Sequence, residues 1–283
     1  MDSLAVGAPD RLLLIYTDRS DPVTRAILEH PARLPCEVIA ISLGQLVNEL
    51  EADGSWAGHG IDPARTALVN RITSLQWAGS GEQPESAFQQ TQLWMWLDRE
   101  VRRFAYASSR PTVHSVLGGY GTLLDQWLDL PALVGGLRVP GHRTPWNDEP
   151  LKGEVYAVDP RQLYQLGKPL SASQREHPGL RLEYVRPGGF LVQAAQVGRM
   201  FLCANAPPFM TSAQHDYIAA FVDRMAARSA ARILEHTFFV GEDLPVFYAT
   251  SPEPVITGGL PEYPELVLRG LIDDLARCDR RPV

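Results

Sequence analysis

The sequence ARILEHTFFVGEDLPVFYATSPEP (residues 231–254) contains two apolar runs, at 234–240 and 246–250, around Gly241-Glu242-Asp243. Aromatic and β-branched runs on either side of a glycine-containing turn are typical of a β-hairpin. The sequence LEYVRPGGFLVQAAQVGRMFLCA (residues 182–204) has the same character, with turns at Gly188-Gly189 and Val197-Gly198. We therefore expect this half of the chain to be rich in short antiparallel strands.

The N-terminal part of the chain alternates between strand and helix patterns. The predicted strands are 12–16, 36–41, 67–72 and 111–116, and the predicted helices are 22–30, 43–50 and 86–107. Strands that alternate with helices form a parallel, doubly wound sheet. The N-terminal part is therefore predicted to be an α/β unit.

The rest of the chain changes from helices to closely spaced strands. A helix at 122–135 contains Pro131, which predicts that it is kinked or split. The further predicted strands are 154–158, 163–166, 180–185, 190–197 and 199–204, and the further predicted helices are 212–232 and 264–278. This succession is typical of a β-meander followed by an α+β unit.

Composition excludes several classes of function. The 283 residues carry a formal net charge of −7, which argues against a nucleic-acid or anionic-membrane binder, because phosphate contacts need a basic face. The three cysteines are far apart and show no metal-binding spacing. The N-terminus has no basic region of a signal peptide, and no apolar run reaches the roughly 20 residues of a membrane span. The sequence predicts a cytoplasmic protein without a structural metal.

Four segments, in order, resemble motifs of the ATP-grasp superfamily, above all its RimK-like and peptide-modifying ligases. They are ALVNRI (67–72), DQWLDLPALVGGLRVP (125–140) and the two stretches at 182–204 and 231–254. The resemblance implies an α/β fold, with an N-terminal parallel-sheet (pre-ATP-grasp) subdomain followed by two β-rich α+β lobes. It divides the chain into the subdomain 1–110, a helical connection 111–147, a central lobe 148–206 and a C-terminal lobe 207–283.

The resemblance also implies a chemistry. Members bind ATP between the two lobes, hold its phosphates with lysines, and bind magnesium with an Asp and a Glu-x-Asn on the last two strands. Magnesium neutralises charge while a carboxylate becomes an acyl phosphate, which an amine then attacks. At the matching positions this chain has Thr237, Ala249 and Ser251 for the metal ligands, Asp159 for a phosphate-binding lysine, and Gln193 for an arginine. These residue types predict that metal binding is lost.

Few residues remain as candidates for binding. Lysine and arginine total 26, but only two of them are lysines, Lys152 and Lys168. Glu183 matches the glutamate that reads the nucleotide, so Glu183, Lys168 and Lys152 are the cofactor-binding candidates. Each is also explained as an ordinary loop, turn or hinge residue.

The candidates for substrate binding are Asn70 and Arg71. They lie at the C-terminal end of the predicted strand 67–72, and doubly wound sheets bind their ligands at the C-terminal ends of the strands. An arginine can bind a substrate carboxylate through two hydrogen bonds. A capping or packing role for Asn70 and Arg71 is the equally simple alternative.

Three interpretations follow. The first is a degenerate ATP-grasp-like protein without ligase activity or a confident cofactor, which binds a peptide or partner protein in a bacterial peptide-modification pathway. The second is an active ATP-dependent carboxylate–amine ligase with relocated metal ligands, which would need ATP and Mg. The third is an unrelated α/β protein. Trp94 and Trp96 point to different sides of the predicted 86–107 helix, which predicts self-association, as in a homodimer, or partner binding there.

Overall fold

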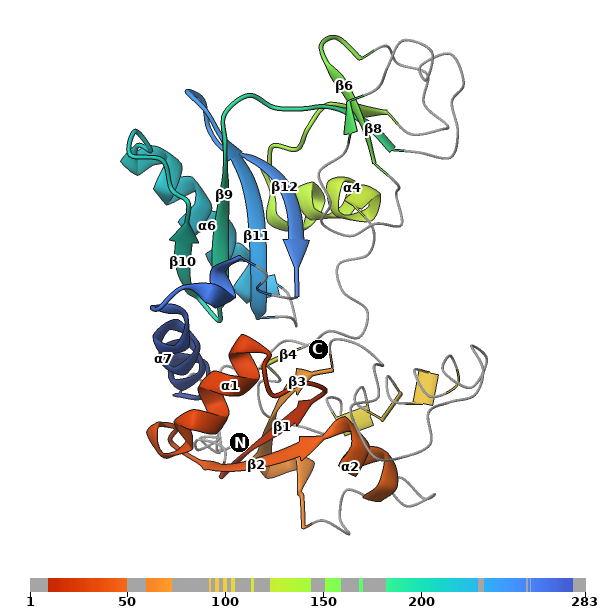
Figure 1. Cartoon of the computed structure of the whole chain (residues 1–283), viewed down its shortest axis with the longest axis vertical. Helices are drawn as coiled ribbons and strands as arrows, with labels where there is room; N and C mark the ends of the chain where they lie inside the picture. Colours follow the sequence, from red (N-terminus) through yellow and green to blue (C-terminus); the bar gives the residue numbers. More distant parts are fainter. Residues whose placement is uncertain are drawn as a thin grey trace, which may run out of the picture.

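The computed structural model describes most of the chain. The described residues are 10–49, 60–72, 123–143, 151–158, 182–228, 232–252 and 256–276, with the short pieces 92, 95–96, 99–100, 103–104, 113–114, 168–169 and 254. They form three four-stranded sheets, arranged as a lower N-terminal unit and two upper units (Figure 1).

The N-terminal sheet is parallel, with strand order β2-β1-β3-β4. Its strands are β1 (Arg11–Tyr16), β2 (Glu37–Ser42), β3 (Thr66–Arg71) and β4 (Val113–His114), and its helical elements are α1 (Pro22–Glu29), η1 (Pro31–Arg33), α2 (Leu43–Glu49) and η3 (Pro63–Arg65). The side chains of β1 from Leu12 to Ile15 are completely buried, because both faces of the sheet are covered. The predicted α/β unit is confirmed.

The C-terminal sheet has the order β10-β9-β11-β12 and is antiparallel. Its strands are β9 (Phe190–Val197), β10 (Met200–Ala204), β11 (Ile233–Val240) and β12 (Val246–Ser251). Helix α6 (Ser212–Arg228) packs on one face through buried side chains such as Phe221 and Met225. The predicted hairpin of β11 and β12 is confirmed.

Helix α4 (Leu123–Val134) covers the edge of β12. Gln126 accepts a hydrogen bond from the Thr250 backbone N–H at 2.7 Å and donates to its carbonyl at 3.2 Å. The Trp127 indole donates to the Tyr248 carbonyl at 2.6 Å. These side chains satisfy an edge strand that would otherwise present unpaired backbone groups. The helix continues through Pro131, so it is not split there, although Pro131 has no N–H to donate to the carbonyl four residues earlier.

The central sheet has the order β5-β8-β6-β7. Its strands are β5 (His142–Arg143), β6 (Val155–Val158), β7 (Lys168–Pro169) and β8 (Leu182–Val185). The segment 186–189, here called the hinge segment, connects β8 to β9. Strands β9 and β10 belong to the C-terminal sheet, although the sequence boundary at 206 placed them in the central lobe. The lobe boundary at 206 stays a prediction.

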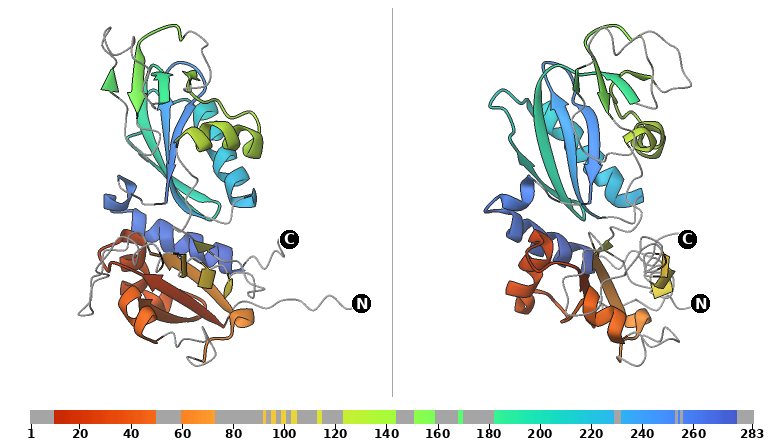
Figure 2. Two further views of the ribbon diagram at one scale, coloured as in Figure 1. Left: turned by 90° about the vertical axis from the view of Figure 1, so that its right-hand side faces the viewer. Right: turned by 45° about the vertical axis from the view of Figure 1, so that its right-hand side comes forward.

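Helix α7 (Tyr263–Ala276) connects the N-terminal sheet to the C-terminal one. Its apolar side chains pack in one cluster with Leu12, Leu14 and Val69 of the N-terminal sheet and with Ala195 and Val197 of β9. Figure 2 shows α7 lying across the contact between the two units, and the short η4 (Thr257–Gly259) leads into it.

Some predictions fall on residues that the structure leaves undescribed. These are the 163–166 strand, Asp159, Trp94 and most of the 86–107 helix, of which only scattered, helical residues are described. Among those, Trp96 packs partly buried against the cluster under the N-terminal sheet, and Met95 is exposed. In the described part of the chain, no helix has the length and apolarity needed to cross a membrane.

Candidate functional site

Two of the three positions that resemble the family's metal ligands, Thr237 and Ala249, lie in one row across the C-terminal sheet, and the third, Ser251, pairs with Glu235 two residues away along β11. Thr237 on β11 pairs directly with Ala249 on β12 and with Gln193 on β9. A β-bulge follows Thr237, between Thr237 and Phe238, and bulges often re-aim side chains beside functional sites. The Gln193 side-chain oxygen accepts a hydrogen bond from Asn205 at 2.9 Å. The sheet thus brings together the residues that the motifs aligned.

The carboxylate nearest to this row already has partners. Glu235 pairs across the sheet with Ser251 and is 5% exposed. Its carboxylate accepts hydrogen bonds from the backbone N–H groups of Ile256 and Thr257 at 3.0 and 2.7 Å, and from the Thr257 hydroxyl at 2.7 Å. Glu235 therefore anchors the segment that leads into η4.

This set of side chains does not fit magnesium. Magnesium takes oxygen ligands, with carboxylates as the usual protein donors. Ala249 has no donor atom, and Thr237 offers only a hydroxyl. Among the described residues, no group of three or more His, Cys, Asp and Glu side chains could hold a metal ion. The donor chemistry of the row thus differs from what ATP-grasp catalysis needs.

The cofactor-binding candidates of the central lobe lie close together along the sheet. Arg143, Glu183, Ala157 and Lys168 follow one another in register across β5, β8, β6 and β7. Glu183 is 3% exposed and forms an ion pair with Arg143, whose Nε donates to it at 3.1 Å. Lys152 is exposed in the segment before β6. Glu183 as a nucleotide reader stays a prediction, and its charge is balanced by Arg143.

Aromatic side chains fill the contact between the central and C-terminal sheets. Tyr184 of β8 lies 5.6 Å from Tyr248 of β12 and 5.4 Å from Trp127 of α4, centroid to centroid. Phe239 of β11 meets Tyr248 edge-on at 5.5 Å. All four rings are at most 2% exposed. The described part of this contact is therefore packed ring against ring.

The two substrate-binding candidates are completely buried. Asn70 accepts a hydrogen bond from the Ile72 N–H at 3.2 Å. The Arg71 guanidinium donates to both oxygens of Asp21, at 3.0 and 2.5 Å, and to the Pro252 carbonyl at 2.9 Å. Arg71 thereby joins the N-terminal sheet to the end of β12. Substrate binding by either residue stays a prediction.

The Arg71–Asp21 pair also shifts a pKa. Burial alone would raise the pKa of the Asp21 carboxyl, but the charge of Arg71 and the hydrogen bonds from Arg71 and Thr24 outweigh burial and lower it. Asp21 is thus held as a carboxylate, and it also caps the N-terminus of α1.

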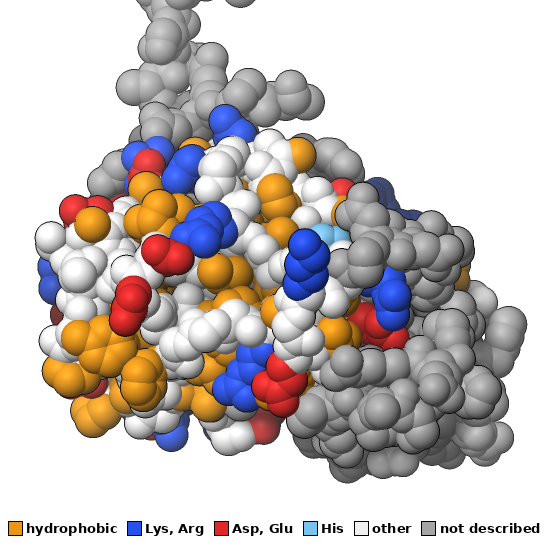
Figure 3. Space-filling model, turned by 90° about the horizontal axis from the view of Figure 1, so that it is seen from above, with side chains coloured by type: hydrophobic (Ala, Val, Ile, Leu, Met, Phe, Trp, Pro, Cys, Tyr) orange, Lys and Arg blue, Asp and Glu red, His pale blue; other side chains and the backbone are white. Residues whose placement is uncertain are grey.

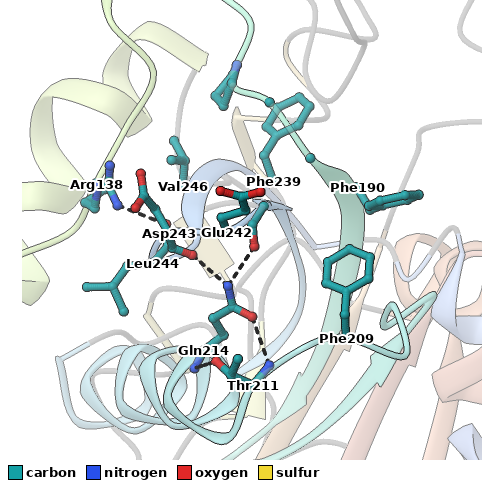
Figure 4. A pocket seen from close by; sticks show the side chains of 14 residues that line it. Arg138, Phe190, Phe209, Thr211, Gln214, Phe239, Glu242, Asp243, Leu244 and Val246 are labelled. Carbon is teal, nitrogen blue, oxygen red and sulfur yellow. Dashed lines mark hydrogen bonds between the residues drawn. The ribbon is translucent and has the colours of Figure 1, made fainter.

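A cavity of about 1020 Å³, here called the hinge cavity, lies between the hinge segment, the tip of the β11–β12 hairpin and the start of α6 (Figure 4). Phe190, Phe209, Leu244, Glu242 and Asp243 are among its lining residues. The sequence does not predict this cavity, because the residues that line it come from segments far apart along the chain.

No protein-family model matches the sequence, and no curated protein matches it either. Solved structures match it over nearly the whole length. The macrocyclase MdnC bound with precursor peptide MdnA, from Microcystis aeruginosa, has a TM-score of 0.65 at 13% identity, covering 93% of this chain and 99% of that chain. The chain therefore has an ATP-grasp fold, and an unrelated α/β fold is ruled out.

Two further structures support this assignment. The ATP-grasp ligase PsnB, complexed with precursor peptide PsnA2 and AMPPNP, has a TM-score of 0.64 at 15% identity, covering 97% of this chain and 100% of that chain. A RimK domain ATP-grasp protein from Sphaerobacter thermophilus has a TM-score of 0.54 at 14% identity, covering 94% and 99%. At such identities the likeness establishes the fold.

Proposed function

We propose that this chain is an ATP-grasp protein without ligase activity, which binds a peptide or a partner protein in a peptide-modification pathway. The observation that carries the proposal is the row of Gln193, Thr237 and Ala249. Thr237 and Ala249 match the family's metal ligands by motif and Gln193 matches its arginine, and none of the three side chains in the row is a carboxylate. Without a metal, phosphate charge is not neutralised and the Lewis-acid contribution of several kcal/mol is missing.

Two further observations support the loss of nucleotide chemistry. Glu183 is neutralised by Arg143 within the central sheet. Trp127, Tyr184 and Tyr248 pack ring against ring where the central and C-terminal sheets meet, and this packing supports the proposal because the family binds ATP between these lobes.

A peptide ligand is supported by what the similar proteins hold. MdnC and PsnB are both described with precursor peptides bound. Because this chain has the same fold, a peptide ligand is the simplest proposal for it. A cytoplasmic location, a bacterial pathway and a homodimer formed through the 86–107 helix stay predictions.

Calorimetry with ATP and Mg²⁺ tests the proposal. We expect a dissociation constant weaker than about 1 mM, which corresponds to less than about 4 kcal/mol of binding free energy, and no release of ADP or phosphate by the chain alone. Micromolar, magnesium-dependent binding that Lys168→Ala abolishes would show an active carboxylate–amine ligase with relocated metal ligands. Arg25→Ala, which removes an exposed cation of α1, is the matched control for the loss of one positive charge.

A further inference from the structure

Exposed hydrophobic side chains gather at the hinge cavity. Six large hydrophobic side chains are exposed in the described part of the chain, and three of them, Phe190, Phe209 and Leu244, line this cavity with exposures of 58%, 51% and 45%. Phe190 and Phe209 meet edge-on at a centroid distance of 5.2 Å. Large exposed apolar groups around a hollow mark an interaction site, whereas single scattered ones do not.

Acidic side chains border the same cavity. Glu242 and Asp243 at the hairpin tip are exposed lining residues. Arg138 also lines it, and its guanidinium donates to the Leu244 carbonyl at 3.1 Å, so the lining carries two carboxylates against one guanidinium. Figure 3 looks down on this end of the molecule and shows hydrophobic side chains gathered at one edge, with acidic and basic side chains nearby. The cavity therefore combines aromatic walls with an excess of negative charge.

The cavity walls are held in place by buried contacts. Gln214, which is 3% exposed, donates to the carbonyls of Gly241 and Asp243 at 2.8 and 2.7 Å and so fixes the hairpin tip to α6. The hinge segment lies directly on the hairpin, since a Cβ on Gly189 would meet the Val240 carbonyl oxygen at 2.3 Å. Gly189 also has a φ of 108°, which favours glycine. A preformed wall lowers the ordering cost of binding.

We infer that the hinge cavity is a peptide-binding site for a segment that carries a large apolar side chain next to lysine or arginine. The apolar side chain enters between Phe190 and Phe209, and the cation lies near the carboxylates of Glu242 and Asp243. Aromatic faces attract cations as well, so both features favour the same ligand. The net charge of −7 further favours a basic segment over an acidic one. This inference rests on the proposed function in that the ligand is a peptide.

Two synthetic peptides of equal length test the inference by calorimetry. The basic peptide is acetyl-GSFKLKG-amide, and the matched acidic peptide is acetyl-GSFELEG-amide. We expect the basic peptide to bind with a dissociation constant on the order of 0.1 mM, and the acidic peptide to bind at least about tenfold more weakly because its charges are repelled. Equal affinity for the two peptides, or binding of neither, would overturn the inference.

Variants place the peptide in the cavity. Phe209→Ala, and separately the double variant Glu242→Gln with Asp243→Asn, should each weaken the basic peptide about tenfold. The matched controls are Leu128→Ala, which removes another exposed hydrophobic side chain (56% exposed), and Asp216→Asn on the exposed side of α6. Both controls should leave the affinity unchanged. If the control variants lost affinity and the cavity variants did not, the peptide would bind outside the hinge cavity.

The same preparations separate this inference from the proposed function. Tight ATP/Mg²⁺ binding with intact peptide selectivity would contradict the absence of ligase activity but support the cavity as the peptide site. If ATP did not bind and Phe209→Ala left the peptide affinity unchanged, the absence of ligase activity would be supported and the cavity as the peptide site would be contradicted.

Discussion

An Arg71→Ala variant is expected to lose about 3–5 kcal/mol of unfolding free energy, because it leaves a buried carboxylate without its counter-ion. The Arg71 and Asp21 side chains are only 1% and 8% exposed. The substitution also removes the donor to the Pro252 carbonyl, so the N-terminal sheet and the end of β12 lose their shared contact. Urea unfolding followed by circular dichroism measures the loss.

An exposed ion pair between the same parts of the chain provides the control. Arg33 and Glu265 form two hydrogen bonds between η1 and α7, with side-chain exposures of 46% and 49%. Because solvent screens exposed charges, Arg33→Ala should hardly move the urea midpoint. The double variant Arg71→Met with Asp21→Asn should recover part of the lost stability, since no charge is left buried alone. A loss below about 1 kcal/mol in Arg71→Ala would contradict this account.

The second large effect is acid sensitivity caused by His236. This histidine is completely buried on β11, with the Phe221 ring edge-on at 4.9 Å. Gln196 donates its amide to the Gly198 carbonyl, so its oxygen accepts from His236 Nε2 at 2.6 Å. His236 Nδ1 is then free to accept from the Thr250 hydroxyl at 2.7 Å. The network thus fits the neutral imidazole.

Burial lowers the pKa of His236 to about 3. Because the unfolded-state pKa is about 6.5, the full stability is present above about pH 6.5 and is lost as pH falls towards 3. The cost per pH unit rises towards about 1 kcal/mol or slightly more once the pH is well below 6.5, so this histidine should remove roughly 2 kcal/mol between pH 6.5 and 4.5. Urea unfolding at a series of pH values measures this slope.

A non-titrating variant isolates the contribution of His236. The His236→Gln variant should be less stable than the unmodified protein at pH 8. Its unfolding free energy should, however, fall much less between pH 6.5 and 4.5. His215→Gln, which changes an exposed histidine of α6, should keep the full decline. If His236→Gln retained the slope of the unmodified protein, the decline would have another origin.

The predicted elements that the structure confirms are those defined by local patterns. The alternation of strands and helices around β1 to β3 and the two apolar runs around Gly241 are local in sequence, and the described elements follow them closely. Sheet membership is harder to predict from the sequence, because only the strand pairing shows that β9 lies beside β11 rather than beside β8.

The site depended on contacts between distant residues. The motif alignment found Gln193, Thr237 and Ala249, and the sheet pairs them. Sequence could not show that Arg71 binds Asp21, 50 residues away, and the Pro252 carbonyl, 181 residues away. The sequence also could not show that Glu183 forms an ion pair with Arg143. That pair depends on the register between strands β5 and β8.

The position of α7 has a consequence for synthesis on the ribosome. The helix covers a face of the N-terminal sheet, and its Glu265 binds Arg33, which lies 232 residues earlier. At about 5–20 residues per second, the nascent N-terminal sheet waits roughly 10 to 50 seconds for this cover. During that time apolar side chains such as Leu12 and Val69 face water. We therefore expect chaperones that bind apolar surface to bind the emerging chain until translation reaches α7.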